Sequence, residues 1–228
     1  KKHIVAIRGR FRPVTNIFLD MLKKGVKQFE NEADVDDDKI CILSELTLRN
    51  LEDGTNQIDE KDFLDRVDIL CSLGQTVLIS NFHEYFKLVA YLSQFTKLRM
   101  ALIMGMPNFE YIFDETHYKD LPGGIISAFA SLFGQKIKLY LYPTLNEQGE
   151  IIHLETFETE PHLAGLLTYL KDNEKLEDIQ KYDENLMTIR TDNVLGMIQH
   201  GVGDWEKMVP ASVAKQIKEN HLFGYANH

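Results

Sequence analysis

The stretch HIVAIRGRFRPVTN, residues 3–16, decides the fold of this chain. Residues 3–7 are dominated by aliphatic and β-branched side chains with little polar alternation, which is typical of a strand covered on both faces. A loop with three arginines, a glycine and a proline follows, and a helical pattern begins directly after it. A buried strand, a polar loop and a helix in succession indicate the first unit of an α/β fold.

The same alternation continues along the chain. Phe18, Leu22, Val26 and Phe29 share one face of the first predicted helix. Further apolar runs cover residues 39–43, 76–79, 100–104 and 137–142. Predicted helices lie between them, around Phe63 to Leu70 with Asp59 as N-cap, and at residues 85–95 and 125–133. We therefore expect a three-layer, Rossmann-like α/β fold with five parallel strands and right-handed crossovers.

The alternation of apolar runs and helical patterns ends after Pro143. Residues 146–160 are acidic and loop-like, and helical patterns follow at residues 162–170, 193–200 and 211–219. We expect an α/β core at residues 1–145 and a mostly helical C-terminal extension at 146–228, packed on the core. The aromatic tail around Trp205 either docks on its own domain or packs on a second subunit or on other domains of a longer chain.

The composition of the chain indicates which classes of partner are disfavoured and in which cellular compartment we expect the protein. The chain has 228 residues and a formal net charge of −10, which disfavours nucleic acid and anionic membranes as partners. No apolar run approaches the roughly 20 residues that span a bilayer. We interpret Cys41 and Cys71 as buried thiols of a cytoplasmic protein. The start without methionine suggests a piece of a longer chain.

Polar residues follow every predicted strand, and ligands of open parallel sheets bind at the carboxyl ends of the strands. We predict an anion site for phosphate or carboxylate there, formed by Gly9, Arg10, Arg12 and Thr15 at the start of a helix. Its other side would be lined by Asn81, with Glu45 and His83 as candidate catalytic groups. In the alternative interpretation, the arginines pair with surface carboxylates and Thr15 or Asn16 only caps the helix.

The first loop resembles the phosphate-binding signature of the nucleotidyltransferase superfamily, in particular nicotinamide mononucleotide adenylyltransferases. That signature reads Gly-x-Phe-x-Pro-x-(His or Thr)-x-x-His after a strand. The residues that fit it are Gly9, Phe11, Pro13, Thr15 and Asn16. The resemblance implies a nucleotide ligand and adenylyl transfer. However, Phe18 replaces the second histidine, which stabilises the transferring phosphate in the family, and no Ser-Thr-x-x-Arg motif follows. We expect Phe18 to pack in the core and transfer by the usual route to be absent.

No metal site is predicted. The histidines show no pair at helical metal spacing, and neither cysteine has a second cysteine nearby. Two acidic clusters, starting at Asp34 and Asp53, approach the spacing of a calcium loop. Both lack the glycine that such a loop needs at its sixth position: the first has Lys39 there, and the second, aligned through Ile58 and Asp59, has Asn56.

Two functions of different class remain open at this stage. One is a domain that binds a phosphorylated or carboxylated small molecule, with or without nucleotidyltransferase-like catalysis; the sequence names no cofactor. The other is a non-catalytic interaction or assembly module of a larger protein or homo-oligomer, acting through the C-terminal helices. The surroundings of Arg8, Arg10 and Arg12 separate the two, because a ligand site needs these arginines at a solvent-filled pocket.

Overall fold

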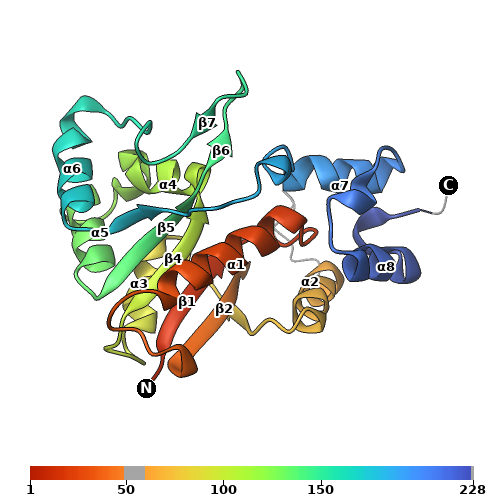
Figure 1. Ribbon diagram of the computed structural model, residues 1–228, viewed down its shortest axis with the longest axis horizontal. Helices are drawn as coiled ribbons and strands as arrows, with labels where there is room; N and C mark the ends of the chain where they lie inside the picture. The colour runs from red at the N-terminus through yellow and green to blue at the C-terminus, as the bar shows by residue number, and fades with distance from the viewer. Residues whose placement is uncertain (49–59, 227–228) are drawn as a thin grey trace. The chain divides into compact units, whose positions relative to one another are not determined.

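The computed structural model describes residues 1–48 and 60–226 of the chain (Figure 1). Its centre is a six-stranded parallel sheet in the order β3-β2-β1-β4-β5-β8. The strands are β1 (His3–Arg8), β2 (Ile40–Thr47), β3 (Val77–Ser80), β4 (Met100–Gly105), β5 (Ile137–Tyr142) and β8 (Leu176–Asp178). A two-stranded antiparallel sheet pairs β6 (Thr144–Leu145) with β7 (Ile151–Ile152). The predicted α/β, Rossmann-like class with a parallel sheet is confirmed.

All five predicted strands are present, and β8 is an addition that sequence patterns missed. β8 lies in the part of the chain predicted as helical, and it pairs with β5 through Leu139 and Leu176. Its three residues include only one apolar side chain, so no buried run marks it in the sequence. β2 also extends to Thr47, which places Glu45 inside the strand and not after it.

The helices follow the predicted amphipathic patterns. They are α1 (Asn16–Glu30), α2 (Glu60–Ser72), α3 (Tyr85–Leu92), α4 (Met106–Phe113), α5 (Gly124–Phe133), α6 (Ala164–Asp172), α7 (Thr191–His200) and α8 (Ala211–Asn220). No predicted helix covers α4; Pro107 stands in its first turn, where the missing amide proton costs no hydrogen bond. Asp59, the predicted cap of α2, lies outside the described residues. Within residues 1–48 and 60–226, no helix is long and apolar enough to cross a membrane.

The chain forms two compact units. Unit 1 comprises Lys1–Ile7, Lys23–Ile42 and Phe82–Tyr182, and unit 2 comprises Arg8–Leu22, Leu43–Asn81 and Asp183–His228. Each unit thus draws on both the first 145 residues and the rest of the chain. The boundary near residue 145 stays a prediction.

The core of unit 1 surrounds β1, β4 and β5, whose side chains are almost all buried on both faces. Right-handed crossovers place α1 on one face and α3 and α5, which pack on each other, on the opposite face. Figure 1 draws α1 in front of these strands. Gly25 permits this close approach, because a Cβ atom there would lie 2.6 Å from Cδ1 of Ile103.

The core of unit 2 joins the N-terminal loop to the C-terminal helices. Its fully buried members include Val14, Leu46, Ile69, Val194, Ile198, Val213 and Ile217. Trp205 is buried in the same cluster, so the aromatic tail docks on its own unit. The prediction of two buried thiols was wrong for Cys71, which is exposed at the end of α2, while Cys41 is half-buried. Cys71 directly follows Ile69 and Leu70 of the inward face, and one further residue turns the side chain outward.

Candidate functional site

The loop between β1 and α1 folds back on itself around a buried aromatic ring. Phe11 has a positive φ of 52°, and its side chain is buried in the core of unit 2. A Cβ atom at Gly9 would lie 2.8 Å from this ring, so only glycine fits there. Phe11 also contacts Phe18 edge to face, with ring centroids 5.0 Å apart. Phe18 packs partly buried against the unit 2 core, as predicted.

Arg8, the last residue of β1, is bound to a buried carboxylate. Its Nε lies 2.5 Å from Oε2 of Glu45, and Nη2 donates to Oε1 at 3.3 Å. The hydroxyl of Ser80, at the end of β3, also donates to Glu45. The amide of Gly9 donates to the Glu45 carbonyl at 3.3 Å. Glu45, a candidate catalytic group, is therefore held on three sides at the strand ends.

Arg12 is bound to a second buried carboxylate. Its Nε lies 2.8 Å from Oδ1 of Asp62 in the first turn of α2. Asp62 also forms an ion pair with Arg66 one turn later, and Arg66 Nη1 donates to the carbonyl of Arg10 at 3.3 Å. This polar cluster pins the loop to α2. Phe63 and Val67 of the predicted apolar stripe pack partly buried against the unit 2 core, and the fully buried residues of the helix also include the charged Asp62 and Arg66.

Arg10 differs from the other two arginines, because its guanidinium remains in solvent. It lies 3.2 Å from the carboxylate of Asp192 in the first turn of α7. The side chains of Arg10 and Asp192 are 60% and 69% exposed. Such an exposed ion pair contributes about 0 to 1 kcal/mol, so a bound anion can replace it at little cost.

The start of α1 is capped by the C-terminal segment of unit 2. The amide of Asn16 donates to the carbonyl of Met208 at 2.8 Å, and the Asn16 side-chain amide donates to the Lys207 carbonyl at 2.9 Å. Thr15, a predicted ligand residue, is buried just before the helix. Neither of these two carbonyl partners could be found from the sequence, because neither leaves a side-chain signature.

The remaining predicted site residues lie in different units. Asn81 belongs to unit 2 and is exposed after β3. His83 belongs to unit 1, where its Nδ1 lies 3.1 Å from the hydroxyl of Tyr111. The ring of Tyr111 stacks on His117 with centroids 3.7 Å apart. The loop residues Gly9, Arg10, Arg12 and Thr15 thus share unit 2 with Glu45 and Asn81, while His83 has its contacts in unit 1.

Of the three arginines, Arg10 is the one whose guanidinium lies mostly in solvent. Sequence reasoning found the arginines but missed their partners Asp62, Arg66 and Asp192. The i, i+4 spacing of Asp62 and Arg66 was the one local signal for them. Among residues 1–48 and 60–226, no group of three or more histidine, cysteine or acidic side chains is placed to hold a metal ion.

No protein-family model and none of the curated proteins compared matches the chain. Among solved structures, Plasmodium falciparum nicotinic acid mononucleotide adenylyltransferase complexed with APC has a TM-score of 0.58 and 11% sequence identity, covering 99% of both chains. A Vibrio parahaemolyticus protein provisionally assigned as a nicotinate-nucleotide adenylyltransferase has a TM-score of 0.35 and 10% identity, over 99% of this chain and 98% of that one. The Plasmodium structure shares the fold of this chain, which agrees with the resemblance of the first loop.

Proposed function

We propose that this chain binds a phosphate-bearing small molecule of the nucleotide class at the loop after β1, with Arg10 as the main contact. The observation that carries the proposal is the exposed guanidinium of Arg10 on a loop that resembles a nucleotide-phosphate signature. The nucleotide class is supported by the fold shared with a mononucleotide adenylyltransferase. Gly9 and Thr15 would shape the same site, as the signature implies.

The energies of the three ion pairs explain why Arg10 is preferred over its neighbours. Arg8 and Glu45 are both buried, and removing Arg8 to bind a ligand would leave an uncompensated carboxylate. Breaking a buried pair in this way costs about 3 to 5 kcal/mol. The Asp62 carboxylate that holds Arg12 is also buried. Only the Arg10 pair is weak enough to exchange Asp192 for a phosphate.

The proposed chemistry stops at binding. Phe18 offers no proton or positive charge to a transferring phosphate, and its ring is held against Phe11. A site that binds the substrate without stabilising the transition state gives affinity and no rate. Adenylyl transfer by the histidine route is therefore not part of this proposal.

A non-catalytic interaction module is the second candidate, and one observation favours it. All three arginines of the loop have carboxylate partners, and α1 is capped by the carbonyls of Lys207 and Met208. In that case the loop serves to fasten the C-terminal helices of unit 2, whose exposed faces would meet a second subunit or another domain.

Calorimetric titration with AMP and adenosine at constant ionic strength separates the candidates. We expect AMP to bind more tightly than adenosine, and Arg10→Ala to weaken AMP binding at least about tenfold, because a charged hydrogen bond is lost. The matched control is Lys215→Ala on α8, which removes an equally exposed cation. If AMP does not bind, or if both variants weaken it equally, the module interpretation replaces this proposal.

A further inference from the structure

A second polar pocket lies within unit 1, between the last two turns of α1 and the residues that follow β8. Its volume is about 560 Å³, and three of the side chains around it are Lys24, Lys27 and Lys181. This volume falls within the range of about 300 to 1,000 Å³ that small-molecule sites occupy. None of its lining residues belongs to the Arg10 loop.

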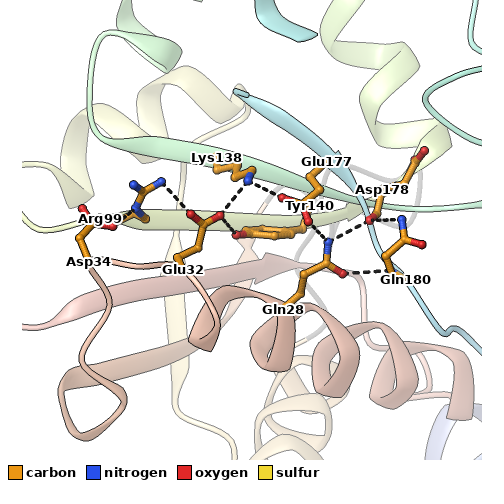
Figure 2. A network of polar contacts seen from close by, with 9 residues as sticks. All are labelled: Gln28, Glu32, Asp34, Arg99, Lys138, Tyr140, Glu177, Asp178 and Gln180. Carbon is orange, nitrogen blue, oxygen red and sulfur yellow. Dashed lines mark hydrogen bonds and ion pairs between the residues drawn. The ribbon is translucent and has the colours of Figure 1, made fainter. Parts of the chain in front are cut away.

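The acidic side chains of the pocket, Glu32 and Glu177, already have cationic partners (Figure 2). Lys138 on β5 lies 2.7 Å from Glu32 and also forms an ion pair with Glu177. The hydroxyl of Tyr140 donates to Glu32 at 2.6 Å, and Arg99 lies 3.3 Å from its other oxygen. Glu32 and Glu177 are therefore paired with cations other than the three lysines that line the pocket.

The loop after β8 is fixed by one glutamine of α1. The side-chain amide of Gln28 donates to Glu177 and to the carbonyl of Asp178, and its oxygen accepts from the amide of Gln180 at 3.0 Å (Figure 2). Lys181 follows with a positive φ of 58°. This conformation costs free energy in a residue other than glycine, so it is kept only where the surrounding structure holds it. The pocket wall that carries Lys181 is thus preformed.

The side chains of the three lysines take no part in the polar network around Glu32, Glu177 and Gln28. Within the residues that the structure describes, Lys24 and Lys181 form no ion pair or hydrogen bond. Lys27 pairs only with Glu30, one turn away, and its side chain is 71% exposed. A favourable interaction with the end of the α1 dipole explains Lys27 but not Lys181, which is outside the helix.

We propose that this pocket, the Lys24 pocket, binds the phosphate group of a small phosphorylated molecule, independently of the Arg10 loop. Three lysines, two from α1 and one from the loop after β8, line one space in a chain whose net charge is −10. The ammonium group of lysine binds phosphate as a compact point charge with three hydrogen-bond donors. The preformed loop reduces the ordering that binding requires.

The test is a titration of the ¹⁵N-labelled full chain with inorganic phosphate, followed by amide chemical shifts at constant ionic strength. We expect saturable shifts at Lys24, Gln180 and Lys181, and an affinity about tenfold lower in Lys24→Gln, because one charged contact is lost. Lys23→Gln is the matched control: it removes the same charge from the neighbouring position of α1, outside the pocket lining.

A parallel titration with succinate distinguishes the kind of anion. Saturable binding of phosphate with little response to succinate supports the proposal, and the reverse order contradicts it. Shifts that fail to saturate, or an equal loss in Lys23→Gln and Lys24→Gln, would show only general attraction to surface charge. The amides of residues 9–12 and 14–16 report the Arg10 loop separately, so either site can fail without the other.

Discussion

The guanidinium of Arg8 and the carboxylate of Glu45 form a buried ion pair at the strand ends of unit 2. Their side chains are 8% and 0% exposed, and Nε lies 2.5 Å from Oε2. Ser80 supplies a further hydrogen bond to the same carboxylate. The sequence suggests a catalytic role for Glu45, but its carboxylate is buried in this ion pair. We therefore expect substitutions of either partner to change the stability of the fold.

Removing one partner of this pair should be far more damaging than removing both. Glu45→Leu removes the carboxylate that pairs with the buried Arg8, and we expect it to lower the free energy of unfolding by about 3 to 5 kcal/mol. The double variant Arg8→Met/Glu45→Leu should recover most of that loss, because apolar replacements of a buried pair are often nearly neutral. Urea unfolding of the wild type, both single variants and the double variant measures the coupling. Additive losses would contradict a direct interaction.

The fold was predictable because its signals are local. Helical stripes such as Phe18 to Phe29 and buried runs such as residues 137–142 repeat within a few residues, and they gave the class and the five strands. The partners of the arginines are not local: Asp192 comes from α7, more than 180 residues after Arg10. A sequence identifies the loop as cationic, but only tertiary packing decides which carboxylate meets which arginine.

Asp192 should compete with the proposed ligand for Arg10. Asp192→Asn removes the charge of an exposed pair worth up to about 1 kcal/mol, so AMP affinity should rise by as much as about fivefold. Asp204→Asn removes a charge from an equally exposed pair with Lys207 and serves as control. Calorimetric titration of both variants with AMP measures the two affinities. An equal rise in both would indicate only a less negative surface, and no rise in either would remove Asp192 as a competitor.

Adenylyl transfer should be undetectable in the wild-type chain. Phe18 occupies the position of the phosphate-stabilising histidine and packs on Phe11, so the developing charge on a transferring phosphate has no partner there. Incubation with ATP and nicotinic acid mononucleotide, followed by chromatography, should give no more dinucleotide than a blank without protein. Dinucleotide formation that disappears in Thr15→Ala would contradict the loss of transfer.

The glycine at the crossing of α1 over β4 should resist even the smallest side chain. Gly25→Ala gains about 1 kcal/mol of helix propensity, but its Cβ would meet Cδ1 and Cγ1 of Ile103 at 2.6 and 2.8 Å. Overpacking of a core costs about 1 to 3 kcal/mol, so we expect a net loss of stability. Adding Ile103→Val removes Cδ1 and should restore part of it. Thermal unfolding of Gly25→Ala and of the double variant with Ile103→Val measures this recovery. If the double variant is no more stable than Gly25→Ala, crowding against Ile103 is not the cause.

The strand that sequence reasoning missed is short and polar, and the inward face of one predicted helix also carries charged residues. β8 contains Glu177 and Asp178, and its place in the sheet depends on contacts with Lys138 and Gln28 from other elements. The inward face of α2 carries Asp62 and Arg66, which no apolar pattern reveals. Charged residues that pair inside the protein look like surface residues in a sequence, because their partners decide their burial.

The charge network of unit 1 should make folding sensitive to acid. Burial alone raises the pKa of Glu32, but hydrogen bonds from Lys138 and Tyr140 and the charges of Lys138 and Arg99 bring it below its ordinary value of 4.5. The hydrogen bond from Arg99 lowers the pKa of Asp34 below 3.8. A carboxylate with a lowered pKa in the folded state contributes stability above its unfolded pKa and loses it as the pH falls through the folded value. The free energy of unfolding should therefore decline below about pH 4.5.

Glu32→Gln tests the origin of this decline, because glutamine keeps the shape of the side chain and cannot be protonated in this range. We expect the variant to be less stable than the wild type at pH 7, where Lys138 loses one of its two carboxylate partners. Between pH 5 and pH 3 its stability should fall less steeply, since one linked proton is missing. Glu219→Gln, at an exposed position of α8, should leave the slope unchanged. Urea unfolding at several pH values measures all three chains. Parallel profiles for wild type and Glu32→Gln would mean that other carboxylates govern acid unfolding.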